Sequence, residues 1–146
     1  MFTVDELIKR GVTEIDEICI LLPTCPLRTF DDIDEAIKLF RIKNADSVIS
    51  YTKETHPIIW HQYVEDDGRL SQVFNADLTN NRQAYKPTFY PNGAIYIFKS
   101  SLLRDNKYYS NNSYAYIMPR ERSVDIDTLE DFEYTKFLLK NHDKKL

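Results

Sequence analysis

The sequence predicts an α/β domain built on a Rossmann-like, mainly parallel sheet, and three observations support this. An apolar run at 18–22 stops at a proline, as a strand buried on both faces does. The segment 29–44 has apolar residues at helical spacing, and 47–51 is a second apolar strand. A strand, a helix and a strand in this order predict a βαβ unit with a right-handed crossover.

The predicted helix has signals at both of its ends. Thr29 is expected to cap the N-terminus, and Asp31 and Asp32 lie in the first turn, where the helix dipole favours negative charge. Asn44 is expected to end the helix. The buried stripe follows i, i+3, i+4, i+7 spacing and consists of Ile33, Ala36, Ile37 and Phe40.

The second half of the chain predicts shorter elements. Between 52 and 90 no strong helix is expected, and Asp67-Gly68 favours a hairpin turn. Pro91-Asn92-Gly93 predicts a turn that starts a strand. The remaining expected elements are a strand at 94–98, a helical turn at 100–104, a strand at 114–118, an extended segment at 124–127 and a last helix capped by Thr128.

Composition narrows the class of protein. The chain has 146 residues, of which 42% are hydrophobic and 29% charged, which fits one domain. A net charge of −4 argues against binding to nucleic acid, which favours a basic surface. No signal peptide is recognisable, and the apolar runs are too short for a membrane span. Cys19 and Cys25 are expected to be reduced thiols, so we predict a cytoplasmic protein without membrane contact.

Asp125 and Asp127 form the sharpest candidate site. On an extended segment, side chains at i and i+2 point to the same side, so both carboxylates would face one point. Oxygen ligands of this kind suit Mg²⁺, which retains waters and needs only one or two carboxylates. The alternative is an acidic loop that leads into a helix N-terminus, which is a common arrangement.

The loop 23–28 follows the first strand at the edge where α/β sheets bind ligands. Arg28 in this loop could hold an anion, or it could be an ordinary surface arginine in a rigid turn. Cys25 is interpreted as a small buried residue rather than a nucleophile, because no histidine lies near it in sequence.

The sequence allows more than one role for two further groups of residues. Arg82 offers a guanidinium that can clasp a carboxylate, although a loop arginine is by default solvent-exposed. Tyr108 and Tyr109 could line a sugar pocket or fill the core.

Three stretches together resemble the acylneuraminate (CMP-sialic acid) cytidylyltransferases, from about residue 18 to 139. They are PTCPLRTFDDIDEAIKLF, the NNRQ…PNGAIYIF segment and PRERSVDIDTLEDFEYTKFLL. The resemblance implies a nucleotide-diphospho-sugar transferase fold and a reaction between CTP and a nine-carbon sugar acid. The anomeric hydroxyl of a sialic or related nonulosonic acid would attack the α-phosphate of CTP, giving CMP-sugar and pyrophosphate.

The resemblance also implies roles for individual residues. Asp125 and Asp127 match the aspartates that hold the catalytic Mg²⁺ or Mn²⁺. Arg82 matches the arginine that binds the sugar carboxylate. The other implied substrate-binding residues are Thr24 and Arg28 in the PTCPLR loop, Tyr96 in the pocket wall, and the pair Tyr108 and Tyr109 near the acyl group of the sugar.

The resemblance implies a domain organisation, and the chain also departs from the family at several positions. The chain, 1–146, would be a single truncated domain, because nothing in 1–17 resembles the family's loop for the CTP phosphates. The part 52–90 resembles a dimerisation and lid insert, which implies a homodimer. Leu22 replaces a sugar-binding glutamine and Ile59 a lysine, which suggests a legionaminic- or pseudaminic-type acid. The rival interpretation is a non-catalytic remnant or dimerisation module.

Overall fold

The computed structural model describes residues 6, 7, 9–11, 15–75, 83 and 85–142. The chain divides into two compact units. The larger unit combines Met1–Thr52 with Pro91–Leu146, and the smaller unit is Lys53–Tyr90. Each unit is described by itself below.

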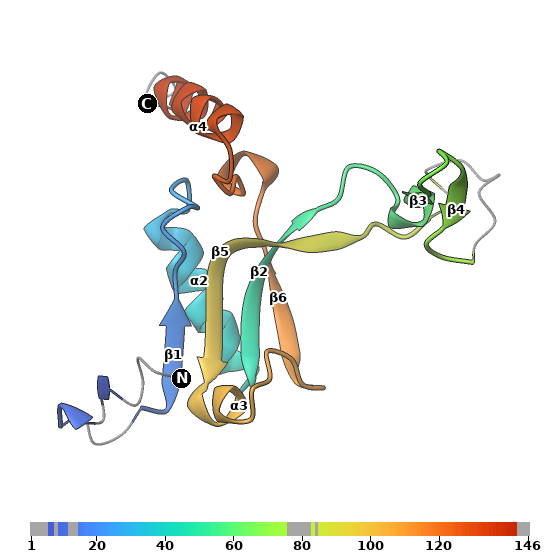
Figure 1. Cartoon of the computed structure of the whole chain (residues 1–146). Coiled ribbons are helices and arrows are strands. Elements are labelled where there is room, and N and C mark those ends of the chain that lie inside the picture. The colour runs from blue at the N-terminus through green and yellow to red at the C-terminus, as the bar shows by residue number, and fades with distance from the viewer. Residues whose placement is uncertain (1–5, 8, 12–14, 76–82, 84, 143–146) are drawn as a thin grey trace. The chain divides into compact units, whose positions relative to one another are not determined.

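The larger unit is built on a four-stranded sheet with the strand order β1-β5-β2-β6 (Figure 1). The strands are β1 (Glu17–Ile20), β5 (Phe89–Lys99), β2 (Ser47–Lys53) and β6 (Ser113–Ile117). The expected order of strand, helix and strand is confirmed in β1, the helix Phe30–Ile42 and β2, although β5 lies between the two strands in the sheet. Strands β2 and β6 pair in parallel.

The expected mainly parallel sheet is wrong, because β5 runs against both of its neighbours. It pairs antiparallel with β1, where Ile18 faces Phe98. Next to β2, Lys99 donates its backbone N–H to Asp46, while Ile95 contacts Ser50. Residue numbers fall along β5 as they rise along β2, so this pair is antiparallel as well. The sheet is therefore mixed, within an α/β unit.

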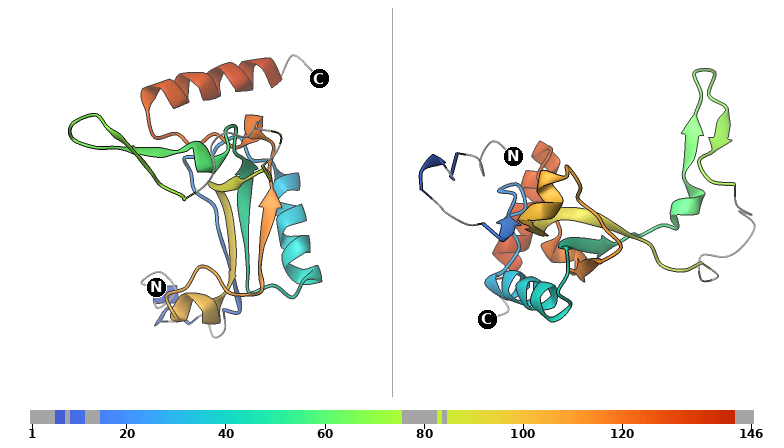
Figure 2. Two further views of the ribbon diagram at one scale, coloured as in Figure 1. Left: turned by 90° about the vertical axis from the view of Figure 1, so that its right-hand side faces the viewer. Right: turned by 90° about the horizontal axis from the view of Figure 1, so that it is seen from below.

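Helix α2 (Phe30–Ile42) covers one face of the sheet, as the left view of Figure 2 shows. Thr29 caps it in a capping box: its hydroxyl accepts from the backbone of Asp32, whose carboxylate accepts from the backbone of Thr29. Asn44, with φ +44°, lies just after the C-cap and ends the helix as predicted.

The two faces of the sheet have separate apolar clusters. Toward α2, the buried stripe Ala36 and Phe40 packs with Val48, Ile95 and Ile97. On the opposite face the buried residues are Ile49 and Phe98, together with Leu102 from the short helix α3 (Ser100–Arg104). Tyr51 and Tyr96 are half-buried against this second cluster, so this face is rich in aromatic side chains.

Strand β1 differs from its prediction. It was expected to be buried on both faces, but Cys19 is exposed and Ile20 is 38% exposed. The reason is its place at the end of the strand order, where it pairs with β5 alone among the described strands. An apolar run shows that a strand prefers burial, but the run cannot show how many neighbours the strand has.

The PNG segment also differs from its prediction. Pro91, Asn92 and Gly93 do not form a separate turn but belong to the eleven residues of β5. Gly93 has φ +77°, a backbone conformation that glycine adopts without strain. Figure 1 shows that β5 bends along its length, and the positive φ of Gly93 permits a change of direction there.

The end of the larger unit contains the 3-10 turn η3 (Arg120–Arg122) and helix α4 (Leu129–His142). Thr128 caps α4 as predicted, since its hydroxyl accepts from the Asp131 backbone and its own N–H donates to the Asp131 carboxylate. Leu129 and Phe137 are more than half exposed. In the described part of the chain, no helix has the length and apolar character needed to cross a membrane.

The smaller unit contains the expected hairpin. The 3-10 turn η1 (Ile58–Trp60) precedes β3 (Gln62–Val64), which pairs antiparallel with β4 (Leu70–Gln72). Gly68 takes a φ of +83°, and its N–H donates to the carbonyl of Glu65. The Asp-Gly signal therefore placed this turn correctly.

Candidate functional site

Three segments that are far apart in sequence meet beyond the end of β1. The loop after β1 is tied to the segment 123–127 by the backbone N–H of Ile126, which donates to the Thr24 carbonyl at 2.9 Å. The Cys25 sulfur lies 3.4 Å from Oδ1 of Asp125 and 3.3 Å from the carbonyl oxygen of Asn92 at the bend of β5. The structure therefore brings together the two loops that the sequence singled out.

Cys25 has no exposed surface, which confirms its interpretation as a small buried residue. Burial raises the pKa of its thiol to about 11, and the Asp125 carboxylate acts in the same direction. The group is therefore a neutral thiol at physiological pH. A thiol of this kind is a weak nucleophile.

Asp125 and Asp127 supply carboxylate oxygens, which are the donors that hard divalent cations take, and the metal site itself remains a prediction. Asp125 is half-buried and Asp127 is exposed, so an ion bound there would keep water ligands, as Mg²⁺ usually does. Gly93 leaves space for Asp125, because a Cβ on this glycine would lie 2.8 Å from the carboxylate Oδ2. Among the described residues, no group of three or more acidic, histidine or cysteine side chains is arranged to hold a metal. Two carboxylates are what this site offers.

An aromatic hollow of about 420 Å³ lies on the sheet face opposite α2. Its lining comprises Ile20, Leu22, Ile49, Tyr96, Phe98, Tyr108 and Tyr109. The three tyrosines named from the sequence therefore share one hollow. The hydroxyl of Tyr109 lies 3.0 Å from that of Tyr51, and these two residues connect the hollow with β2.

Tyr96 links this hollow to the acidic segment electrostatically. Burial raises the pKa of its hydroxyl, and Tyr109, Cys25 and Asp125 shift it in the same direction. Tyr96 therefore stays neutral and can serve as a hydrogen-bond donor at the wall of the hollow.

Arg28 has a role inside the chain. Its Nη1 donates to the carbonyl oxygens of Cys25 at 3.0 Å and Ala94 at 3.4 Å, and also to that of Leu22. These bonds fasten the loop to the middle of β5, beside Gly93. Anion binding by its other N–H groups remains a prediction, as does substrate binding by the exposed Thr24.

Arg82 lies outside the described residues, so its predicted contact with a sugar carboxylate remains a prediction. Gln83, which follows it in the sequence, is exposed.

The sequence did not identify the ion pair between Arg122 and Asp32. The guanidinium donates through Nε at 2.9 Å and Nη2 at 2.8 Å to the two carboxylate oxygens, and Asp32 is only 1% exposed. Burial raises the pKa of Asp32, but hydrogen bonds from Arg122 and Thr29 outweigh it and lower the pKa to about 2. The pair thus joins η3 to the start of α2.

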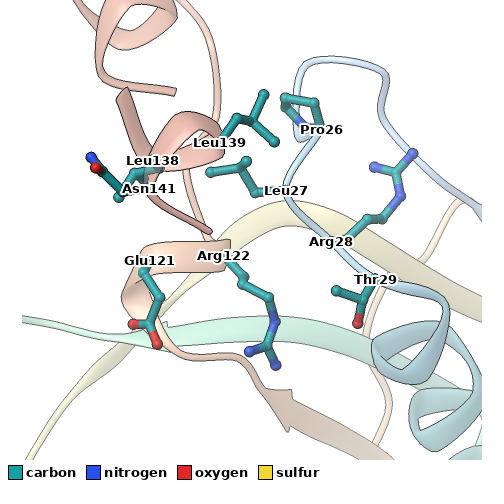
Figure 3. Close-up of a pocket in the computed structure, with 9 residues that line it drawn as sticks. All are labelled: Pro26, Leu27, Arg28, Thr29, Glu121, Arg122, Leu138, Leu139 and Asn141. Atoms are coloured by element: carbon teal, nitrogen blue, oxygen red, sulfur yellow. The ribbon is translucent and has the colours of Figure 1, made fainter. Parts of the chain in front are cut away.

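Beside this ion pair is a second cavity, of about 320 Å³ (Figure 3). Leu27 of the loop, Arg122 of η3 and Leu138 of α4 line it from three elements. The bonds from Nε and Nη2 to Asp32 use two of the five N–H donors of Arg122. The cavity does not contain any of the residues predicted for metal or sugar binding except Arg28.

Asn92 is a second residue whose role the sequence did not predict. It is 3% exposed, and its Oδ1 accepts from the Ser50 hydroxyl at 2.6 Å. Its Nδ2 donates to the Ser123 hydroxyl at 2.8 Å and lies 3.4 Å from the sulfur of Met118. One side chain therefore connects β2, the bend of β5 and the segment that leads to Asp125.

Comparison with known proteins identifies relatives that are similar to this chain in sequence. The chain is 36% identical over 118 residues to an N-acylneuraminate cytidylyltransferase of Streptococcus agalactiae serotype V, covering 80% of this chain and 28% of the relative. It is 33% identical over 133 residues to the protein of that name from Escherichia coli O18:K1:H7, covering 88% and 32%. Over most of its length the chain is therefore similar in sequence to N-acylneuraminate cytidylyltransferases. The resemblance seen in the sequence is thereby confirmed.

A relative with a different sugar in its name is less similar to the chain in sequence. A pseudaminic acid cytidylyltransferase of Campylobacter jejuni is 25% identical over 140 residues, covering 94% of this chain and 60% of the relative. The chain spans about 30% of the length of the two N-acylneuraminate cytidylyltransferases named above. No family model matches the sequence.

Proposed function

We propose that this chain takes part in cytidylyl transfer to a sialic or related nonulosonic acid. The observation that carries the proposal is the aromatic hollow, in which Tyr96, Tyr108 and Tyr109 gather while Tyr96 remains within electrostatic reach of Asp125. A sugar acid with apolar acyl and ring faces suits a hollow of aromatic walls with a few polar groups.

Sugar binding and binding of the cation would be carried out by different residues of the chain. The hollow would hold the sugar, and the hydroxyl of Tyr96 could donate to one of its oxygens. Asp125 and Asp127 would hold Mg²⁺ or Mn²⁺, which when bound neutralises phosphate charge and orients an in-line displacement. The buried Cys25 loop would keep Asp125 in place beside the sugar.

Leu22 supports a choice among sugar acids. Its side chain lines the hollow, so the wall at this point offers no hydrogen bond to a sugar hydroxyl. An apolar wall favours a sugar with a less polar substituent there. We therefore propose a legionaminic- or pseudaminic-type acid as the second candidate substrate, beside N-acetylneuraminate.

Replacing both aspartates by asparagine is expected to abolish specific binding of Mn²⁺. Mn²⁺ takes the same oxygen ligands as Mg²⁺ and broadens nearby NMR signals. In the wild type we expect localised broadening over 123–128 in moderate salt, and none in Asp125→Asn/Asp127→Asn. Asp66→Asn/Asp67→Asn, in the hairpin turn, is the matched control and should behave as the wild type does. Equal broadening in all three proteins would contradict the metal site.

Release of pyrophosphate from CTP, Mg²⁺ and each sugar acid tests the enzymatic proposal directly. Turnover that Asp125→Asn/Asp127→Asn abolishes would support catalysis by this chain. Binding of Mn²⁺ without turnover would instead favour the non-catalytic alternative.

We also propose that the chain forms a homodimer. Among the described strands, β1 lies at the end of the sheet and pairs with β5 alone, and edge strands promote association. The expected result is a dimer across a dilution series in light scattering. A monomer at every concentration would contradict the proposal. The cytoplasmic location remains a prediction.

A further inference from the structure

We propose that Cys25 and Gly93 are positioning residues that fix the Asp125 carboxylate for the divalent cation. The inference rests on the proposed metal-binding function, and it assigns two residues that do not touch the ion to the construction of its site. Both act on Asp125 from inside the protein, one through a hydrogen bond and the other through the absence of a side chain.

The thiol of Cys25 contacts one oxygen of the carboxylate. Its sulfur lies 3.4 Å from Oδ1 of Asp125 and 3.3 Å from the carbonyl oxygen of Asn92, and one S–H proton is available for these two acceptors. A charged acceptor forms the stronger hydrogen bond, so the carboxylate is the favoured partner. The sulfur itself cannot move far, because Cys25 is completely buried and its own carbonyl is held by Arg28.

Gly93 contacts the other oxygen. A Cβ at this position would lie 2.8 Å from Oδ2 of Asp125 and 3.0 Å from the Cys25 sulfur, and real Cβ atoms essentially never come as close as the first of these distances. The φ of +77° adds backbone strain to any replacement. Glycine therefore lets the carboxylate pack directly on the bend of β5.

The two contacts together define the orientation of the carboxylate group. Oδ1 is held by a donor and Oδ2 is held by packing, so rotation about the side-chain bonds would break at least one contact. Asp127 is exposed and its carboxylate has no such support among the described contacts. Asp125 is therefore the preformed ligand, and groups that support a ligand in this way commonly change metal affinity tenfold or more when they are removed.

The hydrogen bond can be tested without any metal. In a Cys19→Ser background, Cys25 is the only thiol, and its S–H stretching band in the infrared reports its acceptor. We expect a band at lowered frequency that moves upward in Asp125→Asn, because a neutral amide oxygen is a weaker acceptor. A band unchanged by Asp125→Asn would show that the proton belongs to Asn92, and it would overturn the role of Cys25.

The effect on the site is tested with Mn²⁺ alone, by broadening over 123–128. Cys25→Ser keeps a donor and is expected to bind within about threefold of the wild type, whereas Cys25→Ala and Gly93→Ala should bind about tenfold more weakly. Thermal unfolding is measured in parallel, so that weaker Mn²⁺ binding caused by a loss of folded protein is recognised. Equal Mn²⁺ affinity in Cys25→Ser and Cys25→Ala would overturn the proposal.

The Mn²⁺ experiment distinguishes the proposed metal function from the positioning role of Cys25 and Gly93. If the wild type shows no localised broadening, the proposed metal function is wrong and the positioning role for a cation is overturned with it. If the wild type binds Mn²⁺ and Cys25→Ala and Gly93→Ala bind it equally well, the metal function stands and the positioning role alone is wrong.

Discussion

Arg122→Ala is expected to lower the free energy of unfolding by about 3 kcal/mol, because it leaves Asp32 as an unpaired buried charge. Asp32 is 1% exposed, and Arg122 supplies two of its hydrogen bonds. The Thr29 contacts remain, but they satisfy the helix N-terminus rather than balance the charge. Chemical denaturation at neutral pH measures the loss.

The pH dependence distinguishes a lost ion pair from lost packing. With a folded pKa of about 2, below the ordinary 3.8, Asp32 stabilises the wild type above about pH 4, and this contribution disappears as the pH falls toward 2. In Arg122→Ala, protonation instead removes the buried charge. The difference in free energy of unfolding between the wild type and Arg122→Ala should therefore become smaller as the pH falls from 4 to 2.

Arg120→Ala is the matched control, because Arg120 lies in the same 3-10 turn and is exposed. We expect it to change stability by less than about 0.5 kcal/mol, as substitutions of exposed residues usually do. A loss in Arg122→Ala that is equally large at pH 2 and pH 7 would refute the electrostatic explanation.

Asn92→Ala should destabilise the fold by about 2–3 kcal/mol, since it removes several buried hydrogen bonds and leaves a cavity. The side chain accepts from Ser50 and donates to Ser123. Asn92→Asp should be at least as harmful, because a carboxylate of the same shape cannot donate to Ser123 and is charged. Urea denaturation of the three proteins measures the differences.

Asn111→Ala provides the comparison for this substitution, since Asn111 is exposed. It should leave stability within about 0.5 kcal/mol of the wild type. If Asn92→Asp proved as stable as the wild type, the donation from Nδ2 to Ser123 would contribute nothing.

The sequence predicted those parts of the fold that depend on neighbouring residues. Thr29 and Thr128 cap their helices, Asn44 ends α2, and Gly68 forms its turn, because capping and turn formation involve residues a few positions apart. The stripe that includes Phe40 became the core face of α2 for the same reason.

Features that depend on distant pairing could not be predicted in this way. The direction of β5 depends on which strands it lies between, and the apolar run of β1 carries the same pattern at an edge as in a centre. Arg122 and Asp32 are separated by 90 positions. Asp32 already had a local explanation as a first-turn acid, so no signal pointed to its distant partner.

The structure shows where the predicted site residues lie, while their roles in binding and catalysis remain predictions. The resemblance named Tyr96, Tyr108 and Tyr109, and the structure places them around one hollow. It did not indicate that Arg28 would bind loop carbonyls, because backbone acceptors leave no trace in the residue pattern. The contact between Cys25 and Asp125 also requires the bend at Gly93, which the sequence suggested only as a turn.

The antiparallel pairing of β2 with β5 has a consequence for how this chain can change over evolution. The smaller unit, Lys53–Tyr90, leaves one strand and returns on its neighbour, and the N–H of Glu54 donates to the carbonyl of Thr88 at 2.9 Å where the two segments meet. Two adjacent antiparallel strands need only a two-residue connection. The smaller unit can therefore be shortened, or replaced by a segment of another protein, without a change in the strand order of the sheet. The entropic cost of closing the connection grows only slowly with its length. The smaller unit could in this way diversify while the pairing of β2 with β5 stays unchanged.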